Sequence, residues 1–169
     1  MAQMKSAIAA ANRTYRKYET RNPEKLAHRM DIIVEELPFK NQKGVYTIMD
    51  RQPIIMVKAG LHPVTRSIVI AHELGHHILH KDELKKTPSL QEFNIFDMTT
   101  SRIEYEANVF AAQMMLPDDE ITEYIYQGFD IQQIARAMKS DINLVALKVA
   151  ELRSRGHQFR EQEYKNKFY

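Results

Sequence analysis

Of all the segments of this chain, residues 62–79 place the strongest limits on its fold, because histidines and a glutamate interrupt an otherwise apolar run there. His72 and His76 are four residues apart, and Glu73 directly follows the first histidine. Residues at i and i+4 lie on one face of an α-helix, so both imidazoles could reach one ion. Pro63 suits a first helical turn, so the sequence predicts a mostly buried helix of about 17 residues carrying an H-E-x-x-H pattern.

This pattern indicates metal-assisted hydrolysis. An ion held by His72 and His76 would lower the pKa of a water molecule from about 16 to roughly 7, and Glu73 could accept its proton. Without an ion, burial of these groups on an apolar helix would be costly. His77 points about 100° away from His76, and His80 lies about 12 Å along the axis from His72. We therefore interpret His77 and His80 as packing residues or as supports for the ligands.

Composition limits the chemistry that the chain can use. Its 169 residues suffice for one domain with a real core, possibly with a small helical addition. The chain has no cysteine, so any metal must be held by His, Asp or Glu. We expect no membrane segment, since no apolar run approaches about 18 residues. The net charge of +2 is too small to indicate a nucleic-acid partner by itself.

Three short β-branched segments predict a small sheet, at residues 31–35, 44–49 and 53–57. The last two flank a turn at residues 50–52. Because a sheet this small needs a helix against one face, we expect it to pack on the H-E-x-x-H helix. The predicted fold class is α+β, with a largely antiparallel three-stranded sheet and a helical C-terminal part.

We expect four segments along the chain: residues 1–21 as an N-terminal helix or tail, 22–127 as the metal-binding core, 128–156 as a helical pair, and 157–169 as a polar tail. The basic, alanine-rich residues 1–18 also have the composition of an organellar transit peptide. The helical pair has the shape of a helix-turn-helix, but its second helix is apolar, with Lys148 as the sole base before its final turn. Direct nucleic-acid binding is therefore not expected.

Two glutamates compete to be the third ligand. The polar residues 81–100 predict a loop near the mouth of the site, and a helix follows from Ser101 to Pro117. Glu104 and Glu106 on it point about 200° apart, so one alone can face the ion. We favour Glu104 because its stripe carries small residues and Asn108, which could orient a ligand. The alternative for Glu104 is a capping box with Ser101.

These motifs together resemble one known family. The run A-H-E-L-G-H at residues 71–76, then E-Y-E-A-N-V-F-A at 104–111 leading to M-L-P at 115–117, is similar to the ImmA/IrrE metallopeptidases. The resemblance covers about residues 22–117, including the strand at Gly44-Val45-Tyr46. It implies a cytoplasmic bacterial or prophage enzyme, often encoded beside a phage-type helix-turn-helix repressor that it cleaves as an anti-repressor.

The resemblance also implies roles for particular residues. The metal ligands fall on His72, His76 and Glu104, and the catalytic glutamate falls on Glu73. Two histidines and a glutamate are usual for Zn²⁺ peptidases, with Mn²⁺ as the alternative ion. The donor that stabilises the oxyanion stays open among three candidates: Tyr46, Tyr105 and His157.

A second hypothesis is a non-catalytic regulator that binds DNA or protein and uses its metal as a structural support. A structural zinc site is closed by four protein ligands. This sequence offers three, with Glu73 beside them. The enzyme acting on a protein substrate is therefore the favoured interpretation.

Overall fold

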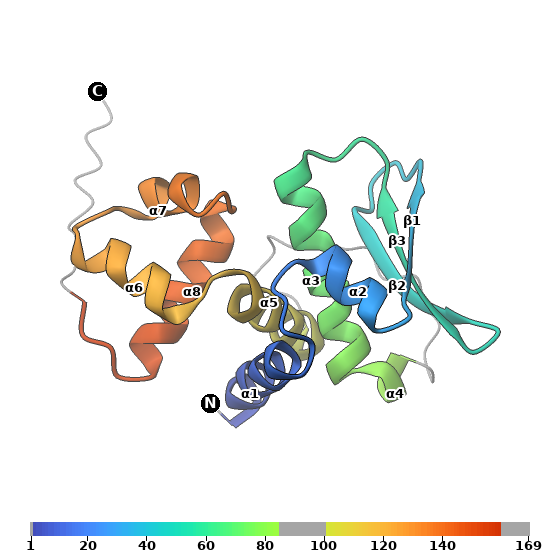
Figure 1. The fold of residues 1–169 in the computed structure, drawn as a ribbon, viewed down its shortest axis with the longest axis horizontal. Coiled ribbons are helices and arrows are strands. Elements are labelled where there is room, and N and C mark those ends of the chain that lie inside the picture. Colours follow the sequence, from blue (N-terminus) through green and yellow to red (C-terminus); the bar gives the residue numbers. More distant parts are fainter. Residues whose placement is uncertain (1, 85–100, 160–169) are drawn as a thin grey trace.

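The computed structural model describes residues 2–84 and 101–159, and side chains from residue 6 onward. Two helices come first, three strands follow them, and the later elements of the described chain are all helices (Figure 1). The elements are α1 Ala2–Tyr18, α2 Pro23–Arg29, β1 Ile33–Leu37, β2 Gly44–Met49, β3 Gln52–Lys58, α3 Pro63–Leu79, α4 Lys81–Leu84, α5 Arg102–Met115, α6 Asp118–Tyr126, α7 Ile131–Ala137 and α8 Ile142–Ser154. The α+β prediction is confirmed, although α4 lies within the predicted loop.

The sheet has the order β1-β3-β2. β2 and β3 are antiparallel, as predicted, and the residues that join them, Asp50 and Arg51, both have positive φ angles, of 49° and 68°. This is the backbone of a type I′ turn, which matches the twist of paired strands. β1 instead pairs in parallel with β3, so the sheet is mixed rather than largely antiparallel. The reason is that β2 takes the far edge and β3 returns to the centre beside β1.

Helix α3 lies at the centre of the molecule, between the sheet and the other helices (Figure 1). It begins at Pro63, and the ring of His62 accepts a hydrogen bond from the Val64 amide. Nine consecutive residues, from Ile68 to His76, are buried, so the helix is enclosed on all sides. The predicted buried helix of about 17 residues is thus confirmed.

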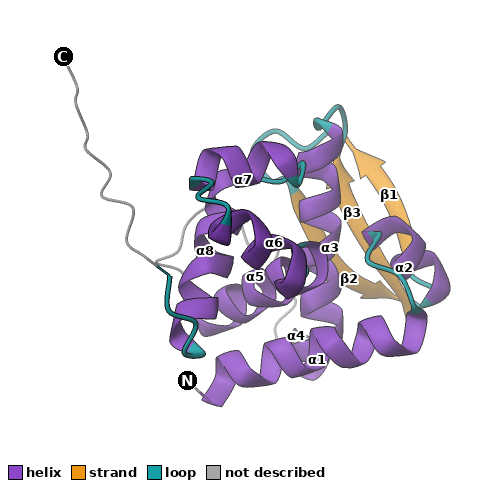
Figure 2. Ribbon diagram, turned by 60° about the vertical axis from the view of Figure 1, so that its left-hand side comes forward, coloured by secondary structure: helices purple, strands orange, loops and turns teal. Residues whose placement is uncertain are grey.

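The sheet covers one side of α3 and α5 covers the other. α1 lies across α5 and the lower end of α3, and it buries Ala7, Ala10 and Ala11 in the common core (Figure 2). α6, α7 and α8 form a helical group on the far side of α5 from the sheet (Figure 1). Within the described residues, no helix is both long and apolar enough to span a bilayer.

Candidate metal centre

The site lies where α3 and α5 come closest, and a glycine permits the approach. A Cβ on Gly75 would stand 3.1 Å from the Cα and 3.2 Å from the carbonyl oxygen of Ala107 on α5. The two helices thus approach closely at Ala107, one of the small residues on the stripe of Glu104. As a result, the side chains at positions 72 and 76 on α3 face those at 104 and 108 on α5.

Three predicted ligands converge at this contact. His72 and His76 bring their Nε2 atoms to 2.9 Å of each other. The carboxylate of Glu104 lies across from them, with Oε2 at 3.4 Å from His72 Nε2 and Oε1 at 3.4 Å from His76 Nε2. One ligand atom from each residue lies within 4.8 Å of the others. Glu104 thus faces the histidines, and the rival Glu106 does not.

The hydrogen bonds of the site leave two unprotonated acceptor atoms close together, one on His72 and one on Glu104. His72 Nδ1 donates to Oδ1 of Asn108 at 2.8 Å, so the lone pair of the neutral ring is on Nε2, facing the site. This confirms the predicted contact of Asn108. Oε1 of Glu104 is buried and has no hydrogen-bond partner among the described residues. A nitrogen lone pair and a buried carboxylate oxygen that share so small a space suit a cation.

Electrostatics keep these groups in the forms that bind metal. Burial lowers the pKa of His72 to about 4, so its ring is neutral at neutral pH. Burial also opposes ionisation of Glu104, but the adjacent imidazoles of His72 and His76 lower its pKa to about 2. Metal binding needs neutral imidazoles and an ionised carboxylate, so little proton release would accompany binding at these two residues.

Glu73 is buried beside this cluster, under the edge strand β2. Burial raises the pKa of its carboxyl well above the usual value, and the charge of Glu104 raises it further, while a hydrogen bond from the Tyr46 backbone amide opposes the shift. Oε1 of Glu73 has no hydrogen-bond partner among the described residues. A Cβ on Gly44 would lie 2.4 Å from Val69 Cγ1 and 2.8 Å from this oxygen. Gly44 therefore leaves the space that Glu73 occupies.

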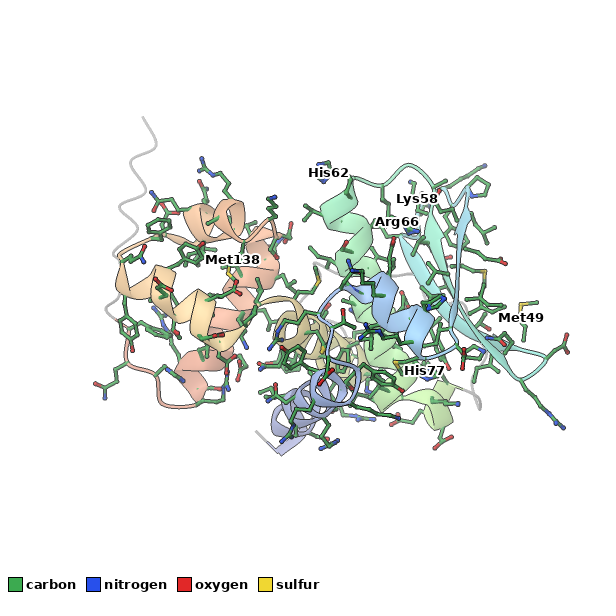
Figure 3. All side chains as sticks on the ribbon, viewed as in Figure 1. Met49, Lys58, His62, Arg66, His77 and Met138 are labelled. Carbon is green, nitrogen blue, oxygen red and sulfur yellow. The ribbon has the colours of Figure 1, made fainter. Side chains whose placement is uncertain are left out.

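The predicted supporting histidines separate into two different contacts. His77, near the C-terminal end of α3 (Figure 3), is hydrogen-bonded through Nδ1 to the Tyr46 hydroxyl at 2.9 Å. His80 instead turns Nδ1 toward His76 Nδ1 at 3.2 Å and donates from Nε2 to Glu106 Oε2 at 2.8 Å. The sequence predicted His80 as a packing residue or a support for the ligands, and its contact with Glu106 was missed. The i, i+4 repeat of His72, His76 and His80 was the available signal.

The capping alternative for Glu104 is wrong, since the Ser101 side chain makes no capping hydrogen bond. The three candidates for the oxyanion donor lie in different places. Tyr46 is tied to Glu73 through its amide, and burial raises the pKa of its phenol to about 12, so the hydroxyl keeps its proton. Tyr105 has its pKa raised by burial and by Glu151 of α8, and His157 stacks on Phe159. Tyr46 is therefore the candidate with a contact to Glu73.

Comparison with known proteins agrees with this geometry. Residues 27–150 match the model of a peptidase family described as the IrrE N-terminal-like domain. The chain is 34% identical over 128 residues to "uncharacterized immunity region protein 2" of Bacillus phage phi105, covering 75% of this chain and 78% of that protein. It is 35% identical over 72 residues to "metallopeptidase ImmA" of Bacillus subtilis (strain 168), covering 41% of this chain and 40% of that protein. The chain belongs to the ImmA/IrrE family of metallopeptidases.

Proposed function

We propose that the protein is a Zn²⁺-dependent endopeptidase that cleaves a phage-type helix-turn-helix repressor in the cytoplasm and so acts as an anti-repressor. The observation that carries the proposal is the convergence of His72, His76 and Glu104 beside the buried carboxyl of Glu73. The relative named for a phage immunity region supports a role in controlling a mobile element.

In this proposal His72, His76 and Glu104 hold the ion, and the fourth position is left for water or substrate. When bound, Zn²⁺ would polarise the scissile carbonyl and lower the pKa of water. Asn108 fixes the ring of His72 so that Nε2 faces the site. His72 and His76 on α3 and Glu104 on α5 already lie close together without an ion.

Glu73 is the proposed catalytic residue. Its carboxylate accepts a proton from the attacking water and passes it to the nitrogen of the leaving amine. Burial and the charge of Glu104 raise the pKa of this carboxyl, which makes Glu73 a stronger proton acceptor than an exposed glutamate. The Tyr46 amide holds the carboxylate in place, and the Tyr46 hydroxyl is our choice among the oxyanion donors.

We assign catalysis to residues 22–127 and a supporting or substrate-binding role to the helical pair at 128–156. The competing function, a regulator with a structural metal, calls for a fourth protein ligand. Within the described ranges 2–84 and 101–159, the site offers three such ligands. A buried glutamate adjacent to them favours hydrolysis instead.

The test uses the purified protein with the repressor encoded by the same genetic element. We expect metal-dependent cleavage, detected by mass spectrometry of the fragments, that a chelator stops and Zn²⁺ restores. Glu73→Gln should lower the cleavage rate by roughly 100-fold or more, because the proton acceptor is lost. Its metal content should equal that of the unmodified protein, and so should that of the control Glu120→Gln, an exposed residue of α6. Loss of the ion from Glu73→Gln would contradict the assignment.

A further inference from the structure

A second row of buried polar groups leads away from the metal centre. It begins at His76, passes through His80 and ends at Glu106, with separations of 3.2 Å and 2.8 Å between the bonded atoms. All three residues are buried, with 1% of His80 and 7% of Glu106 exposed. Burying polar groups costs free energy unless each has a hydrogen-bond partner. The stability of the row therefore depends on which atom donates and which accepts in each hydrogen bond.

The proton positions follow from the chemistry of the last member. A carboxylate only accepts, so His80 donates to Glu106 from Nε2. A neutral imidazole has one N–H, so Nδ1 of His80 must then accept. The group facing it is Nδ1 of His76, which therefore carries its proton there. The lone pair of His76 is left on Nε2, the atom that lies 2.9 Å from Nε2 of His72.

We propose that His80 and Glu106 are positioning residues that hold His76 in the tautomer with its proton on Nδ1, and so set the metal affinity of the centre. They do for His76 what Asn108 does for His72. The inference rests on the proposed function only in naming the metal, since the tautomer belongs to the metal-free protein.

The far end of the row is anchored by an arginine. Arg102 donates from Nη1 to both oxygens of Glu106, at 3.3 Å and 3.1 Å, and from Nη2 to both oxygens of Glu83 on α4, at 3.0 Å and 2.8 Å. Glu106 thus accepts from two sides and has a fixed orientation. Through His80 and Glu106, the His76 ring is therefore connected to Arg102 in the first turn of α5.

The first experiment reads the tautomer directly. Protein labelled with ¹⁵N at histidine, and free of metal, is measured by NMR spectroscopy that correlates ring nitrogens with ring protons. We expect His76 to be protonated on Nδ1 in the unmodified protein. In His80→Phe, which keeps an aromatic ring but has no acceptor, we expect a mixture of the two tautomers. Protonation of His76 mainly on Nε2 in the unmodified protein would overturn the proposal.

The second experiment measures affinity for Zn²⁺ by competition with a chromophoric chelator. His80→Phe should weaken binding by roughly 10-fold or more, as is typical when the partner of a metal ligand is lost. His80→Gln should retain most of the affinity, because its amide can accept from His76 and donate to Glu106. A residue needed only for packing would show the reverse order, since Phe fills the space of the ring better than Gln.

His77→Phe is the matched control, as it alters the neighbouring histidine, whose bond goes to Tyr46 rather than to His76. It should leave Zn²⁺ affinity within about twofold, well inside the change expected from losing a partner of a ligand. Should His80→Phe misfold, Glu106→Gln replaces it, with a smaller loss of affinity expected. Equal affinities across the whole series would overturn the proposal. A protein that shows the expected tautomer but binds no metal would contradict the proposed function and the effect on metal affinity, while the assignment of the tautomer would stand.

Discussion

At the scale of single residues, Glu104 and Glu106 acquire different roles although they are two positions apart on one helix. Helical geometry was enough to predict that one alone could face the histidines. The structure directs Glu104 to His72 and His76, and Glu106 to His80. What Glu106 meets could not be predicted, because that contact depends on how α5 is rotated against α3.

Replacement of Glu104 is the sharpest test of the ligand set. We expect Glu104→Ala to lose most of its bound metal, because one of three proposed protein ligands and its charge are removed. Glu106→Ala should keep part of its metal, with affinity lowered by roughly 10-fold through the loss of the partner of His80. Metal analysis and thermal unfolding of both variants provide the measurement, with Glu120→Ala as control. Full metal content in Glu104→Ala would refute its role.

At the scale of the element, α3 and the three strands were predictable from the sequence, whereas the pairing direction of β1 was not. The proline at position 63 and the apolar run that follows act locally, and they define the helix through short-range geometry. The parallel pairing of β1 with β3 depends on which strand takes the centre of the sheet. That choice is made by long-range packing, which strand propensities do not encode.

The contact between α3 and α5 at Gly75 gives a prediction in which two effects have opposite signs. In an open helix, Gly→Ala would stabilise by about 1 kcal/mol. Here the new Cβ would press on the backbone of Ala107 at 3.1 Å, and a backbone inside a packed core cannot easily move. We expect Gly75→Ala to lower the melting temperature and to weaken metal binding, as Glu104 is pushed outward. Calorimetry and metal titration measure both, and a rise in stability would show that the contact is loose.

At the scale of the whole molecule, buried polar residues connect helices that are distant in the sequence. Gln113 of α5 donates to Asn12 of α1 at 3.0 Å and accepts from Lys148 of α8. Lys148, with 1% of its side chain exposed, also donates to Asp118 of α6 at 2.5 Å. These hydrogen bonds and the ion pair join the C-terminal helices to the core, in addition to apolar packing.

Within the described residues, the β2–β3 hairpin has no such connection at its tip, where the exposed Met49 projects away from the helices (Figure 3).

The network around Lys148 predicts a dependence of stability on pH. Burial opposes ionisation of Asp118, but hydrogen bonds from Arg155 and Lys148 lower its pKa from 3.8 to about 2. The unfolded state therefore binds more protons between these values, so the stabilisation is present above about pH 4 and is lost as the pH falls toward 2.

Asp118→Asn should lower the free energy of unfolding at neutral pH by about 1–2 kcal/mol, a modest value because the carboxylate is partly exposed. The difference from the unmodified protein should shrink as the pH falls through the range of 4 to 2. Denaturant unfolding at several pH values measures it. Asp119→Asn, an exposed neighbour in the same helical turn, should show neither effect. Equal losses in both variants would mean that the helix dipole, and not the ion pairs, is responsible.

The order of the proposed ligands along the chain has a consequence for folding. His72 and His76 precede residues 85–100, and Glu104 follows them. A bound ion would therefore act as a reversible cross-link between two parts of the folded chain that are far apart in the sequence. A chain without cysteine cannot obtain such a constraint from a disulfide. Free Zn²⁺ would then regulate how much of the protein is folded, since a ligand specific for the folded state stabilises it in proportion to the logarithm of its concentration.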